Sequence, residues 1–196
     1  MNTETFNKFN ELLNRFNPIP TEIAEEVFKS GRVEPYAKDE IVFHEKRFSE
    51  FEYFQLEGLS HRYIFDSTSN KLTTGIYEGQ IVITPHFGRT NEAQNIFSLQ
   101  TLSDSSYFII PVKEFEALRS KYKQVEHFAQ AVVATEYKRM MNLEILFRVG
   151  SAKERLVHFR KNYSQLENKI PHLVIATFLG ITSVSLSRIR SELSKE

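Results

Sequence analysis

The hydrophobic pattern changes its period once along this chain, at Pro111, and that change constrains the fold more than any other feature. Between residues 31 and 110 the chain falls into short segments rich in β-branched and aromatic residues, with turn signals at Gly58, at 66–70 and at Gly79. After Pro111, apolar residues recur at helical spacing. The segments expected as strands are 31–36, 40–43, 51–57, 61–66, 71–77, 80–84, 95–101 and 105–110.

Helices are expected on both sides of these strands. Phe6, Phe9, Leu13 and Phe16 predict a helix over 3–16, and a second one should run from Thr21 to Lys29. A short helix carries Phe115 and Leu118, and a long one should run from about Tyr122 to Arg148. Eight short strands flanked by helices predict an α+β chain with a β-sandwich or small barrel.

The composition excludes several classes of protein. The 196 residues include no cysteine, so disulfides, zinc knuckles and iron–sulfur clusters are not expected. Apolar runs are far shorter than the ~20 residues that span a bilayer. The first residues lack the basic and apolar stretches of a signal peptide. We therefore expect a cytoplasmic protein with no membrane partner.

The net charge is zero, but the charges are unevenly distributed. From Ser151 onward there are eight Lys and Arg against four Glu, which gives +4, and the preceding residues carry −4. A basic C-terminal segment on an acidic body is typical of nucleic-acid binding, although an ordinary solvated surface explains it equally well.

The long helix over 122–148 needs a partner for its apolar stripe. At about 1.5 Å per residue it is nearly 40 Å long. We expect the same helix of a second copy to be this partner, and the protein's own barrel is the alternative. Thr135 and Glu136 interrupt the stripe. The predicted dimer contacts are Val125, Phe128, Val132, Met140 and Leu143.

A domain boundary is expected just after this helix. Gly150 is a helix stop, and Ser151 with Glu154 forms a Ser-x-x-Glu capping box that opens a new helix. The predicted domains are therefore 1–121 for the β domain with its flanking helices, 122–149 for the connecting helix, and 150–196 for a C-terminal DNA-binding domain.

Residues 172–191 satisfy the requirements of a helix-turn-helix. Ala176 is small where two helices cross closely, and Gly180 permits the positive φ of a tight turn. Thr182 can cap the second helix. The inward positions on the two helices are apolar, namely Ile175, Leu179, Ile181, Leu186 and Ile189.

The second helix, about Ser183 to Leu193, should enter the major groove of DNA. Arg188 can make a bidentate contact with guanine, whereas Val184 can contact only a thymine methyl. Arg190 is expected on a phosphate, together with Lys153 and Lys169. The predicted DNA-binding residues are Thr182, Ser183, Val184, Ser187, Arg188 and Arg190.

This order of elements resembles the Crp/Fnr family of transcription regulators over nearly the whole chain. The resemblance is sharpest at 151–156 and from Ile175 to Arg190, and there it is similar to Bacteroidetes-type members. It implies an antiparallel β-barrel sensor domain of the double-stranded β-helix type, resembling cyclic-nucleotide-binding domains. It also implies a homodimer paired through the long helix that binds near-palindromic DNA. RNA polymerase is an implied partner, and an unidentified small-molecule effector stays open.

The sequence departs from the family at two places. Cyclic-nucleotide-binding members carry a Gly-Glu pair and, about ten residues on, an Arg-Ser pair. In this chain the first site, residues 83–86, is Ile-Thr-Pro-His, and the second site, residues 94–96, is Gln-Asn-Ile. Arg89 lies between them in a turn-like loop. We therefore expect no cAMP binding and no cofactor. In addition, no β-hairpin is predicted between Leu156 and Pro171, so the family's wing should be reduced or missing.

Two other functions compete with DNA binding. A metal-dependent cupin-like enzyme would need clustered histidines, but the six are scattered, so no catalytic or metal-binding residue is predicted. They are His44, His61, His86, His127, His158 and His172. A protein-interaction module that does not bind DNA is the second alternative, and Val184 gives it slight support.

Overall fold

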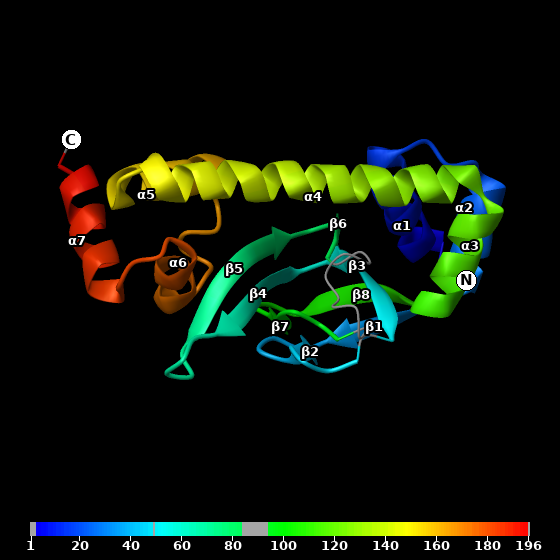
Figure 1. The fold of residues 1–196 in the computed structure, drawn as a ribbon, viewed down its shortest axis with the longest axis horizontal. Coiled ribbons are helices and arrows are strands. Elements are labelled where there is room, and N and C mark those ends of the chain that lie inside the picture. The colour runs from blue at the N-terminus through cyan, green and yellow to red at the C-terminus, as the bar shows by residue number, and fades with distance from the viewer. Residues whose placement is uncertain (1–2, 49, 84–93, 196) are drawn as a thin grey trace. The chain divides into compact units, whose positions relative to one another are not determined.

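The computed structural model describes residues 3–48, 50–83 and 94–195 (Figure 1). The first part of the chain holds helices α1 (Thr3–Phe16) and α2 (Thr21–Lys29). Eight strands follow: β1 (Arg32–Tyr36), β2 (Ile41–Phe43), β3 (Phe51–Glu57), β4 (Leu59–Phe65), β5 (Lys71–Glu78), β6 (Ile81–Val82), β7 (Ser98–Thr101) and β8 (Ser105–Pro111). The rest is helical: α3 (Val112–Lys121), α4 (Lys123–Val149), α5 (Ala152–Asn162), α6 (His172–Phe178) and α7 (Ser183–Leu193).

The strands form two four-stranded sheets, with orders β1-β8-β3-β6 and β2-β7-β4-β5. The prediction of a closed barrel is therefore wrong, and the domain is a β-sandwich of open sheets. A barrel needs a continuous ladder that returns to its first strand. Here the outer strands β2 and β6 have only three and two residues, which is typical of a sheet edge.

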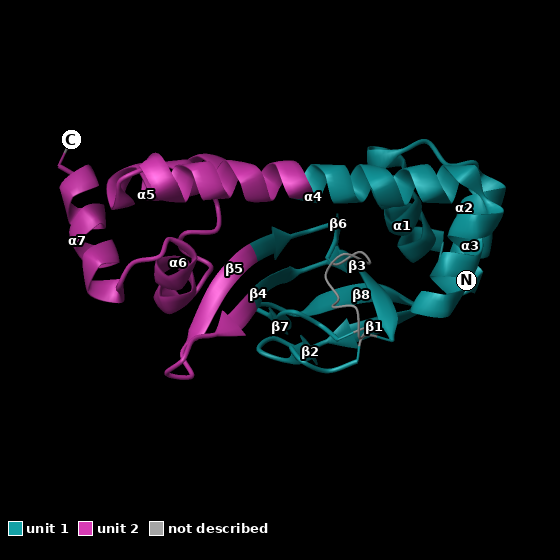
Figure 2. Ribbon diagram, in the orientation of Figure 1, with its two compact units in different colours: residues 1–62, 76–136 teal, residues 63–75, 137–196 magenta. Residues whose placement is uncertain are grey.

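The chain divides into two compact units (Figure 2). Unit 1 comprises 1–62 and 76–136, and unit 2 comprises 63–75 and 137–196. The boundaries thus differ from those drawn from the sequence. Unit 2 begins inside α4, and it also takes in the tip of the β4–β5 hairpin.

Aromatic rings fill the core of unit 1. Phe9 of α1 is fully buried, and its ring lies 4.4 Å from that of Phe108 and 5.6 Å from that of Phe54. Phe54 in turn stacks on Phe128 of α4 at 6.2 Å. The apolar positions of the first helix and of the strands that the sequence pattern identified therefore meet in a single cluster.

An ion pair in unit 1 explains why the apolar stripe of α4 is interrupted. The guanidinium of Arg62 on β4 lies 2.9 Å from the carboxylate of Glu136 on α4, and both side chains are largely buried. Arg62 also lies over the ring of Phe97 at 5.1 Å. An acidic residue at position 136 thus provides the partner that the buried arginine requires.

The predicted dimer contacts on α4 differ in their burial. Val125, Phe128 and Val132 are at most 3% exposed, and they pack into the core of their own unit. These three residues therefore belong to the core of their own unit, and the side of the helix that they occupy is covered within the same chain. Leu143, five turns after Val125 on the same side, is half-buried, while Met140 is 45% exposed.

The helices of unit 2 begin where the sequence predicts. Ser151 caps α5, its side chain accepting a hydrogen bond from Glu154 N, and the Glu154 carboxylate accepts one from Ser151 N. Phe159 and Phe178 are buried beside each other at 5.9 Å. The tip of the β4–β5 hairpin reaches α6 of the same unit, where Thr177 Oγ1 lies 3.1 Å from Thr73 Oγ1.

Between α5 and α6 the chain forms turns over 164–169 and no strand, in agreement with the prediction that no hairpin lies there. His86 in the first cassette site and Arg89 in the predicted loop lie outside the described residues. Over the ranges that the structure describes, no single helix is long and apolar enough to cross a membrane. Taken together, α6 and α7 have the length and composition of a membrane span, but the two helices are bent by 91° relative to each other.

Candidate nucleic-acid interface

The segment predicted as a helix-turn-helix forms two helices, α6 and α7, that meet at 91°. The turn between them closes with two backbone hydrogen bonds, from Gly180 N to Thr177 O and from Ile181 N to Ala176 O. This is the Schellman arrangement, in which a residue with positive φ ends the helix. Gly180 has φ of +64°, as the sequence predicts.

The inner faces of the two helices are apolar and buried. Ala176 and Leu186 have no exposed surface, and Ile189 is 5% exposed. Because Ala176 has no side chain beyond Cβ, α7 can approach α6 closely at the crossing. The inward residues predicted on α6 and α7 are thus buried, whereas Ile181 in the turn is half-buried.

Helix α7 presents one side of its first two turns to solvent. Thr182 is the N-cap, and its Oγ1 accepts a hydrogen bond from Ser185 N at 3.1 Å. Val184 is 81% exposed. The Arg188 side chain is 74% exposed, and its closest acidic neighbour is Glu192 at 3.9 Å, one turn on. Five of the six predicted contact residues share this exposed side, namely Thr182, Ser183, Val184, Ser187 and Arg188.

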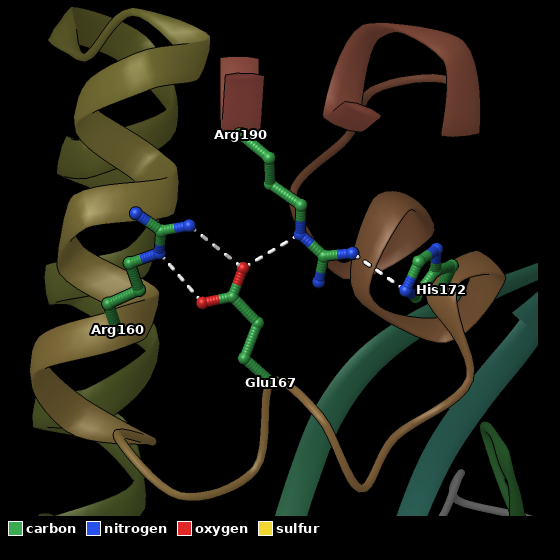
Figure 3. Close-up of polar contacts among 4 residues, drawn as sticks. All are labelled: Arg160, Glu167, His172 and Arg190. Atoms are coloured by element: carbon green, nitrogen blue, oxygen red, sulfur yellow. Dashed lines mark hydrogen bonds and ion pairs between the residues drawn. The ribbon is translucent and has the colours of Figure 1, made fainter. Parts of the chain in front are cut away.

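Arg190 faces the interior of the unit instead (Figure 3). Its Nε donates to Glu167 Oε1 at 2.7 Å, and its side chain is only 18% exposed. Arg160 of α5 donates to the same carboxylate from Nε and Nη2, at 2.7 and 3.1 Å. Arg190 Nη1 also lies 2.8 Å from His172 Nε2. Since arginine can only donate, that nitrogen of His172 must be the acceptor.

The sequence analysis did not identify this group of four residues. Glu167 stands alone in a turn segment with no periodic pattern, and Arg190 was assigned to phosphate because of its charge. The available signal was an isolated acid within a basic segment. An acidic side chain surrounded in sequence by basic ones can contact several of them when the helices pack together, as Glu167 does with Arg160 and Arg190.

The environment of Glu167 shifts its ionisation. Burial raises the pKa of this carboxyl, but the hydrogen bonds and charges of Arg160 and Arg190 outweigh that effect, and the pKa lies below its ordinary value of 4.5. The carboxylate is therefore held in its charged form between two guanidinium groups.

The basic residues of the C-terminal segment fall into two groups, those with contacts inside the unit and those on its surface. Arg160 and Arg190 pair with Glu167, and Arg155 lies over the ring of Phe147 at 5.0 Å. Other cations lie on the surface: Lys161, Lys169, Arg188 and Lys195. Lys153 is half-buried, so its exposure is intermediate between those of the two groups.

Asn95, in the second site of the cyclic-nucleotide cassette, makes a structural contact in unit 1, and so does Gln80, which precedes the first site. Gln80 holds α1, since its Oε1 and its backbone carbonyl both accept hydrogen bonds from Arg15. Asn95 is 6% exposed and donates from Nδ2 to His44 O at 3.0 Å. Within the described ranges, no three His, Asp or Glu side chains gather in an arrangement that could hold a metal ion.

This fold, a two-sheet β domain joined through a long helix to a small helical unit, is found among transcription regulators. The structure of FixK2 from Bradyrhizobium japonicum matches with a TM-score of 0.73 and 19% identity, over 84% of this chain and 85% of that one. The c-di-GMP responsive global regulator CLP of Xanthomonas campestris matches with a TM-score of 0.74 and 12% identity, over 90% and 92%.

A transcriptional regulator of the crp/fnr family from Eubacterium rectale matches with a TM-score of 0.74 and 17% identity, over 96% of this chain and 88% of that one. No family model and no curated protein matches the sequence. The chain thus has the fold of Crp/Fnr-type transcription regulators.

The turn at Gly180 yields the first test. Gly180→Ala should lower the free energy of unfolding by about 1–2 kcal/mol, because a side chain disfavours the left-handed backbone. The added Cβ would also lie 3.0 Å from Phe147 Cε1. Urea unfolding measures this loss. Gly180→Asn should lose less, because asparagine tolerates this φ, and equal losses for the two variants would contradict the backbone argument.

The carboxylate of Glu167 makes the stability of unit 2 depend on pH. Because the folded pKa lies below 4.5, the group stabilises the fold fully above pH 4.5, and this contribution disappears as the pH falls through the lowered folded pKa. The difference in unfolding free energy between the wild type and Glu167→Gln should therefore be largest above pH 4.5 and shrink below it. Urea unfolding from pH 3 to 7 measures it, and a difference independent of pH would refute the assignment.

Proposed function

We propose that this protein is a homodimeric, sequence-specific DNA-binding transcription regulator that reads DNA with α7. The observation that carries the proposal is the exposed side of that helix. It begins at a capped N-terminus, it is set at 91° to α6 by the turn at Gly180, and it bears Arg188 with small polar residues. The segment 172–193 then acts as a helix-turn-helix, and 150–196 acts as the DNA-binding domain.

Each exposed residue of α7 has a role that follows from its chemistry. Arg188 can donate two hydrogen bonds to O6 and N7 of a guanine in the major groove. Val184 can pack on a thymine methyl, and Ser183 and Ser187 can contact either bases or phosphates. Thr182 lies at the positive end of the helix dipole, next to which a phosphate is favoured.

Arg190 has a different role in this proposal from the one expected of it. Its Nε and Nη1 are already engaged by Glu167 and His172 within the unit. Phosphate contacts then fall to exposed lysines, of which Lys169 is the one that the sequence analysis also selected.

A second copy of the chain is proposed to pack on the exposed side of α4. Tyr137, Met141 and Ile145 recur at four-residue spacing and are 63%, 37% and 54% exposed. At about 100° per residue they lie opposite the side that carries Val125, Phe128 and Val132. Exposed apolar residues in such a row are typical of a helix that pairs with another helix. A dimer would place two copies of α7 on half-sites about one turn, ~34 Å, apart.

For unit 1 we propose a sensor-like domain that does not bind cAMP. Support comes from Asn95 in the second cassette site, which donates to the backbone at His44 instead of presenting a phosphate contact. An unidentified effector and RNA polymerase remain proposed partners, and a bacterial regulator of this kind would act in the cytoplasm.

A protein-interaction module is the second candidate, and the 81% exposure of Val184 favours it. The two functions separate in a selection from a random duplex pool at two salt concentrations. A regulator should recover a near-palindromic motif, with an affinity that falls as salt rises, because phosphate contacts release counterions. Recovery of no motif, with no retention at low salt, would reject DNA binding.

Arg188 provides a direct test of base recognition. Arg188→Ala should weaken binding to the selected duplex by about 1–3 kcal/mol through loss of a bidentate contact. Arg188→Lys keeps the charge, and it should keep the salt dependence while losing discrimination at one base pair. Fluorescence anisotropy measures both. Lys29→Ala, which removes an exposed cation of α2, is the control, and a loss as large in that control would show that Arg188 does not read bases.

A substitution at Met141 tests whether the exposed side of α4 is the dimer surface. Met141→Glu should convert a dimer into a monomer of 22.9 kDa, because it places a charge at the centre of the apolar row. Sedimentation velocity measures the mass. Asn142→Glu adds the same charge one residue on and about 100° around the helix, and it should leave the dimer intact. A wild type that is already monomeric would contradict the proposal.

A further inference from the structure

Glu167 is the point at which three helices of unit 2 are tied together. It lies in the turns between α5 and α6, and its side chain is 15% exposed. One oxygen accepts from Arg160 of α5, and the other accepts from both Arg160 and Arg190 of α7. The second contact of Arg190, to His172, adds the first residue of α6 (Figure 3).

These contacts add hydrogen bonds to a part of α7 that is otherwise held by apolar burial. The turn at Gly180 and the cap at Thr182 fix the beginning of the helix. Leu186 and Ile189 bury its inner side, but hydrophobic burial has no directional preference, so it leaves the helix free to rotate by small amounts about its axis. Arg190 attaches the later part of the helix through hydrogen bonds, which require defined geometry.

The rotation of α7 decides which way its contact residues point. Arg190 lies two residues after Arg188 on the same helix, so a rotation of the helix moves the backbone positions of both residues together. A rotation that lengthens the bond from Arg190 to Glu167 also turns Arg188, Ser187 and Val184 away from the direction they now face. Holding a contact residue to within a fraction of an ångström is what specific recognition demands.

We propose that Glu167 is a positioning residue for DNA recognition: through Arg190 it fixes the rotation of α7, and thereby the ratio of specific to non-specific binding. The inference rests on the proposed function, and it assigns to Glu167 an effect on sequence discrimination beyond its effect on stability. It also gives Arg190 an indirect part in recognition, in place of a phosphate contact.

Charge alone predicts the opposite result for Glu167, which makes the proposal testable. Glu167→Gln removes a negative charge, so long-range electrostatics should strengthen binding to any DNA. If Glu167 positions α7, the same variant should bind the selected duplex more weakly. The ratio of its affinities for the selected and a scrambled duplex should fall about tenfold, which equals the loss of roughly one base contact.

The experiment measures both affinities by anisotropy at several salt concentrations for wild type, Glu167→Gln, Arg190→Gln and Arg190→Lys. Both glutamine variants should lose discrimination, although they change the net charge in opposite directions. Arg190→Lys should recover part of it, since an ammonium can still bind the carboxylate. Glu25→Gln, in the exposed pair with Lys29, is the matched control and should leave the ratio unchanged.

Circular dichroism and urea unfolding separate positioning from loss of structure. The affinities are compared at a temperature at which every variant is folded, and Arg190→Lys serves if Glu167→Gln does not fold. An unchanged affinity ratio in folded Glu167→Gln, or tighter binding to both duplexes, would overturn the positioning role and leave the proposed function intact. A wild type without preference for any duplex would overturn both.

Discussion

The burial of one side of α4 in an aromatic core is the interaction on which the rest of the structure depends. Val125, Phe128, Ala129 and Val132 pack among rings from α1, β3 and β8, and the Arg62–Glu136 pair adds a directional contact on the same side of the helix. A helix of 27 residues held in this way has a defined rotation. In the part of α4 that belongs to unit 2, Tyr137, Met141 and Ile145 are exposed.

In the C-terminal unit, the orientation of α7 depends on a different combination of interactions. Its core contains Ala176 and Leu186, which bring α6 and α7 together, and the rings of Phe159 and Phe178. Direction comes from polar contacts at the two ends of α7, the Thr182 cap and the Glu167 carboxylate. A buried ion pair contributes little net stability once the desolvation of its charges is counted, so specification of geometry is the more natural role for it.

Much of the fold follows from the sequence, because local signals and packing agree. All eight strands and the long helix lie within a few residues of their expected positions, and the capping box at Ser151 and the turn at Gly180 form as predicted. The local sequence pattern cannot identify the surface against which the apolar side of a helix packs. Val125, Phe128 and Val132 fit a dimer seam and a protomer core equally well by spacing, and only the tertiary contacts decide. The openness of the sheets depends on long-range pairing in the same way.

In α6 and α7 the features that backbone geometry dictates form as predicted, whereas the surroundings of one charged residue, Arg190, differ from those expected. Gly180, Ala176 and Thr182 each meet a steric or hydrogen-bonding requirement that a sequence displays. Arg188 and Arg190 look alike in the sequence, yet one is exposed and the other is bound to Glu167. The difference depends on a residue more than twenty positions away in a turn without periodicity.

The most direct test of the account is methylation interference on the duplex that the protein selects, since this maps the groove that α7 occupies. If α7 lies in the major groove of two half-sites, methylation of guanine N7 should block binding in two clusters about one helical turn apart. Interference at adenine N3 in the minor groove, or a single cluster, would contradict a dimer that reads DNA through α7.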